Sequence, residues 1–395
     1  MMNVPKIRFS KYNYEWNYDP LNKYVERIVR KNKNKESDLV LTISAQYGLV
    51  DQCTFFNRNV SSSNLDGYYL LYNGDFAYNK SYSNGYPWGA VKRLNLYDKG
   101  VVSSLYICFN TNTLIDSDYL QHYFETNKWY SQISSISVEG ARNHGLLNIA
   151  VNDFFNTEHF FPTLAEQKDI AKVLNLLDKK IELQSKKIED LKLFKKGLLI
   201  KEFNNKKCSN KLKECFDFGK AGGTPKSTNK DYYNGNIPFL SISDMTTQGK
   251  YIYYTDKSIT EAGLNNSTAW LVPKNSIIIS MYASYGLVSI NKIDLTTSQA
   301  MFNMVINKNY VVEYIYYYLY YLYISNFYNS IVSTGTQSNL NAEQIKLLDI
   351  YIPCYNEQKR IYEQFSKIDF KINLEQKKIN ELLYLKKGLM QNMFV

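Results

Sequence analysis

The chain has 395 residues, of which 45% are apolar and 21% are charged. This length suggests more than one domain, and the apolar content excludes an intrinsically disordered chain. The longest apolar stretch, 311–324, is too short and too rich in tyrosine to span a bilayer, and the N-terminus lacks the apolar core of a secretory signal. We therefore expect a cytoplasmic protein that does not associate with membranes.

Cysteine, histidine and charge narrow the function classes. The five cysteines are scattered without a Cys-x-x-Cys pair, which is typical of reduced thiols, and the three histidines have no ligand-like spacing. The residue pattern therefore predicts no metal site and no nucleophilic dyad. A net charge of +10 suits a protein that meets phosphate, although an AT-rich genome that favours lysine would produce the same surplus.

In chain order, the pattern predicts two mixed globules, each followed by a long helix. The first globule spans 1–161, with strands at 38–44 and 101–109 and a helix at 116–133. The second spans 204–352, with strands at 237–243 and 276–280 and a helix at 312–330. The long helices are predicted at 162–203 and 353–395.

Both long segments show the apolar spacing of a coiled coil, alternating between three and four residues. In the first, a capping box of Thr163 and Glu166 directly follows Pro162 and predicts the start of the helix. The apolar positions are Ile170, Leu174, Leu177, Ile181, Ile188, Leu191 and Leu198 in the first helix and Ile361, Phe365, Ile368, Ile372, Ile379, Leu382 and Leu389 in the second. Forty helical residues make a rod of about 60 Å, which needs a partner to cover its apolar seam.

An internal repeat organises the whole chain. Residues 162–203 align without gaps on 353–394 at an offset of 191, and 18 of the 42 positions are identical. A fainter repeat at an offset of 195 relates 118–124 to 313–319, so the globules are duplicated as well. The predicted fold class is therefore α+β, with two globules separated by two long helices that pair as an antiparallel coiled coil with pseudo-two-fold symmetry.

Polar residues interrupt both apolar seams at equivalent positions. These residues are Gln184 and Glu375 near the helix midpoints, and Lys195 and Lys386 farther along each helix. We hypothesise that Gln184 and Glu375 meet in a polar layer that fixes the register of the helices. The alternative is that local splaying of the helices exposes them.

No catalytic constellation stands out. The segment 219–227, GKAGGTPKS, resembles a phosphate-binding loop, but Pro225 occupies the position of the second glycine, and no clear strand precedes it. No G-x-G-x-x-G motif opens a helix, and no Asn/Asp-Pro-Pro-aromatic segment of an amino-methyltransferase is present. The chain is therefore not expected to be an enzyme by itself.

The combination of repeat and motifs resembles the specificity (S) subunit of type I restriction-modification systems. The resemblance covers essentially the whole chain. It rests on the segments PTLAEQ at 162–167, NEQ at 356–358, KKGLL at 195–199, KKGLM at 386–390, GGTPK at 222–226, YYNGNIP at 232–238, ISD at 242–244, GTQSNL at 335–340, VPKIRF at 4–9, YNKSY at 78–82 and GAVK at 89–92.

The resemblance implies that each globule is a target-recognition domain for one half of a split DNA sequence and that the helices act as spacers. It implies three kinds of partner: double-stranded DNA, two adenine-methylating subunits, and two motor-nuclease subunits. No cofactor is expected in this chain. The methylating subunits would use S-adenosylmethionine, and the motor subunits would use ATP and magnesium.

The candidate DNA contacts are polar, aromatic and basic residues in the irregular segments between predicted elements, because loops on a rigid scaffold commonly carry specificity. In the first globule they are Lys80, Ser81, Tyr82, Asn84, Tyr86, Trp88, Lys92, Arg93, Arg142, Asn143 and His144. In the second they are Lys220, Thr224, Lys226, Ser227, Tyr282, Ser284, Tyr285, Thr336, Gln337 and Asn339. Each of them could equally be an ordinary surface residue, and each aromatic residue could be part of a core.

The charge is distributed unevenly along the chain. Lys plus Arg exceed Asp plus Glu by one in residues 1–162, and by three in each of 163–203, 204–353 and 354–395. Nearly neutral globules suggest that much phosphate affinity comes from local clusters or from partner subunits. Two other interpretations remain open: a complete modification-restriction enzyme, and a coiled-coil scaffold whose globules bind carbohydrate or protein.

Overall fold

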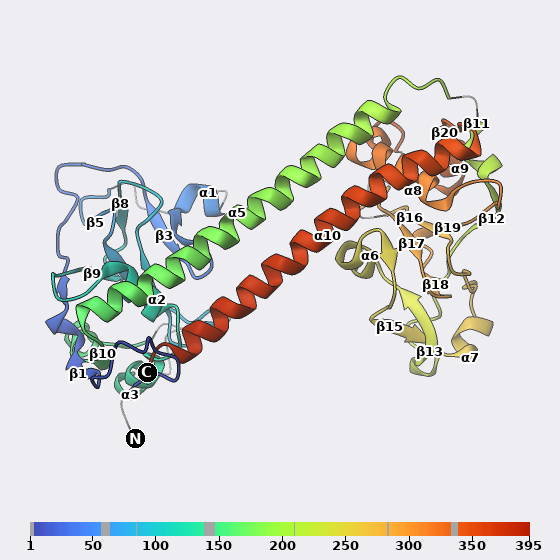
Figure 1. The fold of residues 1–395 in the computed structure, drawn as a ribbon. Coiled ribbons are helices and arrows are strands. Elements are labelled where there is room, and N and C mark those ends of the chain that lie inside the picture. Colours follow the sequence, from blue (N-terminus) through green and yellow to red (C-terminus); the bar gives the residue numbers. More distant parts are fainter. Residues whose placement is uncertain are drawn as a thin grey trace. The chain divides into compact units, whose positions relative to one another are not determined.

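The computed structural model describes residues 4–56, 64–83, 85–137, 147–208, 210–282, 284–332 and 339–395. The chain divides into two compact units (Figure 1). Unit 1 comprises residues 1–185 and 378–395, and unit 2 comprises residues 186–377. Helices α5 (Leu164–Phe203) and α10 (Tyr355–Asn392) each contribute one segment to both units.

Unit 1 contains a four-stranded antiparallel sheet in the order β2-β9-β6-β7, the short pairs β1-β10, β3-β4 and β5-β8, and the helices α1 to α4. The strands of unit 1 are β1 (Asn17–Pro20), β2 (Val25–Arg27), β3 (Leu41–Ser44), β4 (Gly48–Asp51), β5 (Tyr69–Tyr72), β6 (Phe76–Asn79), β7 (Ala90–Arg93), β8 (Lys99–Val102), β9 (Ile107–Thr111) and β10 (Glu158–Phe161). Its shorter helices are α1 (Gln52–Phe56), α2 (Ser117–Phe124), α3 (Tyr130–Ile136) and α4 (Val151–Phe155), together with the 3-10 turn η1 (Leu21–Lys23).

Unit 2 repeats this design with additions. Its main sheet has the order β12-β19-β16-β17-β14, and a second sheet has the order β15-β13-β18. The strands are β11 (Asn210–Lys211), β12 (Phe216–Ala221), β13 (Tyr233–Leu240), β14 (Tyr251–Ile252), β15 (Lys257–Ile259), β16 (Ile277–Ser280), β17 (Val288–Asn291), β18 (Thr296–Thr297), β19 (Met301–Ile306) and β20 (Asp349–Ile350). The shorter helices are α6 (Ile242–Gln248), α7 (Glu261–Asn265), α8 (Val312–Ile324) and α9 (Ala342–Lys346), with 3-10 turns η2 (Leu212–Cys215), η3 (Lys230–Tyr232) and η4 (Phe327–Ser330).

The two units place equivalent sequence positions in equivalent contacts. In unit 1, Phe394 packs against Tyr119 of α2 with ring centroids 5.3 Å apart. In unit 2, its repeat counterpart Phe203 packs against Tyr314 of α8 with centroids 5.9 Å apart. The predicted internal repeat therefore extends from the sequence into the packing of both cores.

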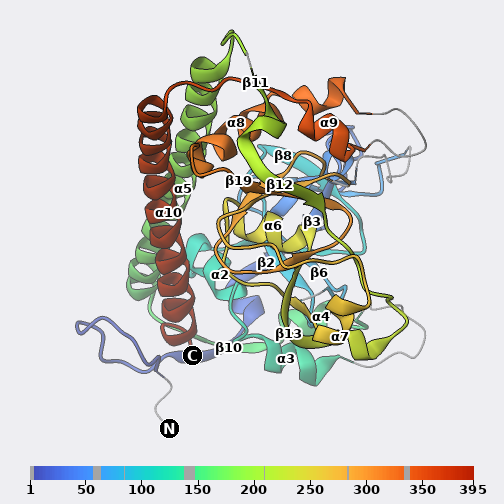
Figure 2. The same ribbon diagram turned by 90° about the vertical axis from the view of Figure 1, so that its right-hand side faces the viewer.

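In each unit a helix packs on the main sheet, which has four strands in unit 1 and five in unit 2, and the α5/α10 segments cover that helix. Figure 2 shows this layering for α8, which lies between the main sheet and the long helices. The edge pairing of the two main sheets also corresponds, because β2 pairs with β9 as β12 pairs with β19, both antiparallel. The α+β class with an internal repeat is confirmed.

Within each unit the α5 and α10 segments run antiparallel. In unit 2, Lys187 contacts Glu375, Lys195 contacts Asp369, and Arg360 lies 3.9 Å from Glu202, so positions advance along α5 as they retreat along α10. In unit 1, Lys386 contacts Asp178 in the same sense. The predicted seam positions Leu174 and Phe365 are fully buried, each in the core of its own unit, whereas Ile181 is partly buried.

The glutamine of each EQ motif anchors the covering helix of its unit. Gln167 accepts the amide of Asp116, the N-cap of α2, at 2.8 Å and donates to Pro162 O at 2.9 Å. Gln358 accepts the amide of Val311, the N-cap of α8, at 3.0 Å and donates to Pro353 O at 2.9 Å. One buried amide side chain therefore satisfies two backbone groups in both repeats.

The predicted capping box at α5 is only half correct. The amide of Glu166 donates to Thr163 Oγ1 at 3.4 Å. The Glu166 carboxylate, however, binds the guanidinium of Arg8 at 2.7 and 2.8 Å and accepts the Trp16 indole N–H at 3.4 Å. The buried glutamate therefore holds the N-terminal segment against α5.

Three predicted strands are shorter or divided. The predicted strand 38–44 forms only from Leu41, and 101–109 is divided by a turn in which Tyr106 N donates to Ser103 O at 3.1 Å. The predicted strand 237–243 ends at Leu240, because Ser241 caps α6 in a box with Asp244.

Both predicted globule helices are also interrupted. The segment 116–133 divides into α2 and α3 around Thr126, whose hydroxyl donates to Tyr123 O at 2.6 Å. The segment 312–330 stops at Ile324, because Asn326 adopts the left-handed conformation at φ 58°.

Candidate nucleic-acid interface

Three segments of unit 2 meet at one end of its main sheet. Ala221, the last residue of β12, pairs with Phe302 near the start of β19. Ser280, the last residue of β16, pairs with Met301. The chain that leaves β12, the chain that leaves β16 and the chain that enters β19 therefore lie together, and we call residues 222–227, 281–285 and 298–300 the loop end of unit 2, with position 283 not described.

The GGTPK segment follows β12 in a tightly packed path. Gly222 N donates to Met301 O at 3.0 Å, and Gly223 N donates to Thr297 O at 2.9 Å. A Cβ at Gly222 would lie 2.1 Å from the hydroxyl oxygen of Thr297, so only glycine fits. Gly222 and Gly223 of the phosphate-loop-like sequence therefore allow close backbone packing against Thr297 and Met301.

Most candidates of the second globule lie exposed at this loop end. The exposed candidates are Thr224, Lys226, Ser227, Ser284 and Lys220, which is the residue before the last of β12. Tyr282 is 41% exposed. The Thr224 hydroxyl donates to Gln299 Oε1. Tyr285 is partly buried and donates to Asn329 Oδ1 at 2.8 Å. Asn339 adjoins them, because Leu340 N donates to Met281 O at 2.9 Å.

Unit 1 has an equivalent loop end, formed by the turn between β6 and β7. Asn79 at the end of β6 pairs with Ala90 at the start of β7, so the described residues between these strands project from the same end of the sheet as those between β16 and β17 do in unit 2. Ser83 N and Tyr86 O, and Tyr86 N and Ser83 O, close the turn at 3.3 and 2.8 Å. Tyr82 is 60% exposed at its tip.

The other candidates of this loop are partly buried. Lys80 donates to Ile149 O at 3.1 Å, and burial lowers the pKa of its ammonium group. Ser81 N donates to Asn79 Oδ1 at 3.1 Å. Tyr86 is half-buried, and Trp88 packs on the core of unit 1 while its carbonyl accepts the Tyr78 hydroxyl at 2.8 Å. These residues support the loop more than they extend from it.

Two basic candidates lie away from the loop end. Lys92 is 7% exposed, and its ammonium group lies 2.5 Å from Glu125 Oε1. Arg93 bonds Asp118 at 2.7 Å and the Ser117 hydroxyl at 2.9 Å at the start of α2. Both side chains link β7 to α2, Arg93 at the start of the helix and Lys92 at its C-cap residue Glu125.

Six predicted contacts lie outside the described residues: Asn84, Arg142, Asn143, His144, Thr336 and Gln337. Sequence reasoning also overlooked Gln299, which is exposed beside Thr224. It precedes an apolar strand without any motif, so no signal marked it.

The polar seam residues of the long helices have partners. Glu375 is 3% exposed and accepts from Lys187 Nζ at 2.9 Å within unit 2. Lys195 bonds Asp369, and Lys386 bonds Asp178, each at 2.5 Å. These two ion pairs are exchanged by the repeat, because Lys386 is the counterpart of Lys195 and Asp178 that of Asp369. Gln184 is half-buried in unit 1, and its predicted layer with Glu375 stays a prediction.

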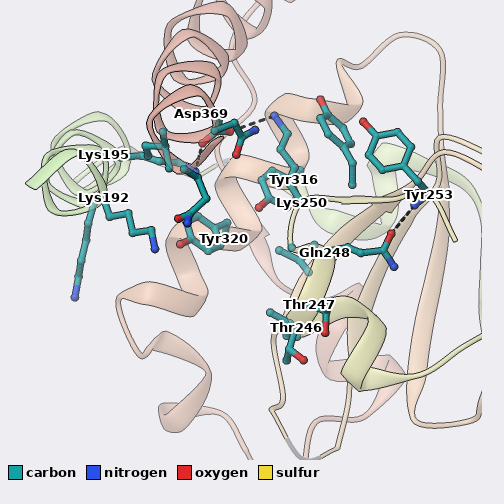
Figure 3. Close-up of a pocket in the computed structure, with 18 residues that line it drawn as sticks. Lys192, Lys195, Thr246, Thr247, Gln248, Lys250, Tyr253, Tyr316, Tyr320 and Asp369 are labelled. Carbon is teal, nitrogen blue, oxygen red and sulfur yellow. Dashed lines mark hydrogen bonds and ion pairs between the residues drawn. The ribbon is translucent and has the colours of Figure 1, made fainter. Parts of the chain in front are cut away.

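The helix pair of unit 2 also borders a basic cavity of about 610 Å³, shown in Figure 3. Lys195 and Lys250 approach the Asp369 carboxylate from two sides, at 2.5 and 3.6 Å. The Tyr317 hydroxyl donates to the same carboxylate at 2.5 Å, and Lys250 Nζ donates to that hydroxyl at 2.8 Å. Burial lowers the pKa of Lys250 to about 8, and nearby Asp369 only partly offsets that effect.

Within the described ranges, no group of three or more His, Cys, Asp or Glu side chains is placed to hold a metal ion. In the same ranges, none of the helices combines the length and the hydropathy needed to cross a membrane. The described side chains at the two loop ends can form hydrogen bonds, aromatic stacking contacts and cationic contacts.

Comparison with known proteins identifies related sequences. The family model for the type I restriction modification DNA specificity domain matches residues 205–384. The MjaIX specificity subunit of Methanocaldococcus jannaschii is 31% identical over 176 residues, which cover 44% of this chain and 40% of that protein. The HindI specificity subunit of Haemophilus influenzae is 28% identical over 178 residues, which cover 43% and 38%. The chain thus spans about two fifths of the length of these curated relatives.

Solved structures show the same fold across the whole chain. The S subunit of the type I system of M. genitalium matches with a TM-score of 0.55 at 16% identity, covering 99% of both chains. A chain from a structural study of complex assembly and conformational transition in a type I system matches with a TM-score of 0.61 at 16% identity, covering 98% of this chain and 99% of that one. The type I restriction modification DNA specificity domain therefore matches residues 205–384, and the whole chain shares its fold with the solved S subunit of M. genitalium.

Proposed function

We propose that this chain is the DNA sequence-specificity subunit of a type I restriction-modification complex. Residues 1–161 and 204–352 are two target-recognition domains, and each reads one half of a bipartite DNA target. Residues 162–203 and 353–395 are the helices that set the unread spacer and dock partner subunits. The chain itself is non-catalytic and directs methylation and restriction by its partners.

The observation that carries this proposal is the duplicated loop end. Both units present exposed aromatic and polar side chains at the same end of the four strands that correspond between their main sheets, at Tyr82 in unit 1 and at Thr224 and Tyr282 in unit 2. Their surroundings differ in sequence, while the sheets and covering helices beneath them correspond. A constant framework with two different exposed ends suits one reader that was duplicated and then acquired two specificities.

Two linked readers also explain the long helices. Joined readers multiply their selectivity, so neither half needs tight binding alone. A rod of about 60 Å is long enough to hold two readers roughly one duplex turn, about 34 Å, apart on one DNA face. We therefore expect an insertion of four residues in each rod to lengthen the unread spacer without altering the bases read.

The partners and cofactors follow from the proposed role. Two copies of a methylating subunit fit a chain with an internal two-fold repeat, because the repeat offers two equivalent surfaces. We propose that they bind S-adenosylmethionine, that two motor-nuclease subunits bind ATP and magnesium, and that the complex acts on DNA in the cytoplasm. The present chain binds none of these cofactors.

The test is to co-express the chain with the methylating subunit of its own system and to map methylated adenines across the host genome. We expect a bipartite motif with a fixed gap that disappears when this gene is deleted. Tyr82→Ala should relax only one half of the motif, and Tyr282→Ala only the other. Tyr14→Ala is the control, because Tyr14 is 79% exposed in the N-terminal segment, outside the loop end.

Three outcomes would contradict the proposal. Deletion without any change in methylation would favour a scaffold. Methyl transfer by the purified chain alone would favour a complete enzyme. If either tyrosine variant altered both half-sites, the assignment of one reader to each unit would fail.

A further inference from the structure

The Lys-Lys-Gly motif of each long helix borders a cavity against the globule of its unit. In unit 2, Lys195 and Lys196 line the cavity of about 610 Å³ between the long helices, α6, β14 and α8. In unit 1, the repeat counterparts Lys386 and Lys387 line a cavity of about 490 Å³ beside Tyr86 and Tyr130. The repeat has therefore placed the same basic pair at a cavity twice.

The unit 2 cavity has more positive charge than its own acid can balance. Four lysines line it, Lys192, Lys195, Lys196 and Lys250, against the single carboxylate of Asp369. Lys195 and Lys250 share that carboxylate. Among the described residues, neither Lys192 nor Lys196 forms an ion pair. An excess of three positive charges therefore faces the cavity.

The ammonium groups of Lys195 and Lys250 are largely buried beside aromatic rings. The side chains of Lys195 and Lys250 are 13% and 12% exposed. Lys195 Nζ lies 5.0 Å from the ring centroid of Tyr320, and Lys250 Nζ lies 5.3 Å from that of Tyr316. The depressed pKa of Lys250 fits a partly desolvated cation that is incompletely balanced by Asp369. A bound anion would supply the missing negative charge.

We propose that the unit 2 cavity binds an oxyanion, and that this oxyanion is a backbone phosphate of the DNA duplex. The proposal rests on the proposed function and adds a sequence-independent contact outside the loop ends. The exposed ammonium groups of Lys192 and Lys196 bind the phosphate, while the ion-paired Lys195, Lys250 and Asp369 form the largely buried wall of the cavity. Thr246 and Thr247 border the same space in Figure 3, and the Thr247 hydroxyl can donate to a phosphate oxygen, whereas that of Thr246 donates to Ser243 O at 2.9 Å.

The distribution of charge favours DNA as the source of the phosphate. The two long-helix segments hold six of the ten net positive charges, whereas residues 1–162 hold one. Sequence-independent affinity for DNA scales with the number of phosphates that the protein neutralises, so it must arise where the surplus lies. In unit 1, the counterpart of Lys192 is the uncharged Leu383, and the acidic Glu125 borders the cavity. We therefore expect a weaker phosphate contact there.

The test uses the full chain assembled with its methylating subunit. Fluorescence anisotropy would measure the affinity for a duplex with the mapped target and for a scrambled duplex over a series of salt concentrations. We expect Lys196→Gln to reduce the slope of log affinity against log salt by about one, and the Lys192→Gln/Lys196→Gln double variant by about two. The affinities for both duplexes should fall by the same factor, and the methylated motif should not change.

Lys201→Gln is the matched control, because Lys201 is exposed on the same helix and does not line the cavity. An unchanged salt slope in the double variant would overturn the proposal. A loss confined to the target duplex would also overturn it, because a backbone contact cannot discriminate sequence. A loss of the methylating subunit in size-exclusion chromatography, with unaltered DNA binding by the remaining complex, would assign the cavity to an acidic partner group and overturn it as well.

A free anion is distinguished by a second measurement. If inorganic phosphate raised the unfolding temperature of the wild type but not of the double variant, while the salt slope stayed the same, the cavity would be a small-anion site and the DNA assignment would fail. Failure of the proposed function itself differs from all of these results. In that case the wild-type complex would show no methylated motif and no preference between the two duplexes.

Discussion

Asp369 supports a largely buried charged cluster of the long helices, and its replacement by asparagine tests how that cluster stabilises unit 2. Its carboxylate receives Lys195 and the Tyr317 hydroxyl at 2.5 Å each, and Lys250 lies 3.6 Å away. The substitution Asp369→Asn keeps the shape of the side chain and one acceptor oxygen. It removes the negative charge that two largely buried ammonium groups share.

The repeat counterpart provides the comparison. Removing one partner of a buried ion pair costs about 3–5 kcal/mol, whereas exposed pairs contribute about 0–1 kcal/mol. Asp369 is 21% exposed and serves two lysines that are 13% and 12% exposed, so we expect a loss of about 3 kcal/mol. Asp178 is 40% exposed and, among the described residues, forms an ion pair with Lys386 alone, so Asp178→Asn should cost about 1 kcal/mol.

Hydrogen exchange measured by mass spectrometry reports the opening free energy of each unit separately. Asp369→Asn should speed exchange in α8 and leave α2 unchanged, while Asp178→Asn should have a small effect confined to α2. Equal losses in both variants would refute the reasoning, because they would show that burial does not set the strength of these pairs. An unchanged α8 would refute the role of the shared carboxylate.

Three further predictions concern pH, backbone packing and helix anchoring. Burial lowers the pKa of His159 to about 3. Below the unfolded-state pKa of about 6.5, the unfolded chain therefore binds a proton at His159 that the folded chain does not bind. Proton uptake at His159 should therefore lower the free energy of unfolding of unit 1 by about 1.4 kcal/mol per pH unit from pH 6 to pH 4. Urea denaturation of His159→Gln should show a pH dependence that is smaller by this amount, while the part due to His122, whose pKa burial also lowers, remains. Gly222→Ala should lower the thermal midpoint of unit 2, because its Cβ would meet Thr297 at 2.1 Å, whereas Gly197→Ala in α5 meets nothing within 4 Å and should stabilise by about 0.5–1 kcal/mol. Gln358→Leu leaves two backbone groups without their partner and should cost about 2 kcal/mol in chemical denaturation, and an unaffected stability would contradict the anchoring role.

The loop ends show what could not be predicted from the sequence. Lys92 and Tyr82 both belong to polar segments and were equal candidates. The register of β6 against β7 places Tyr82 at an exposed tip and Lys92 on the covered face beside Glu125. A one-residue shift would exchange faces, because side chains alternate along a strand, and no local pattern in so short a strand determines that register.

By contrast, the long helices and the repeat were determined by the sequence itself. Their signal is local and occurs twice, because each seam position lies three or four residues from the next and the same motif ends both helices. The resemblance to type I specificity subunits rests on those motifs for the same reason. Only the tertiary structure decided which polar residues gather at the sheet ends, that the EQ glutamines anchor α2 and α8, and that the two Lys-Lys pairs border cavities. These features depend on contacts between residues that lie beyond the reach of local sequence patterns, where loop closure and packing outweigh any local preference.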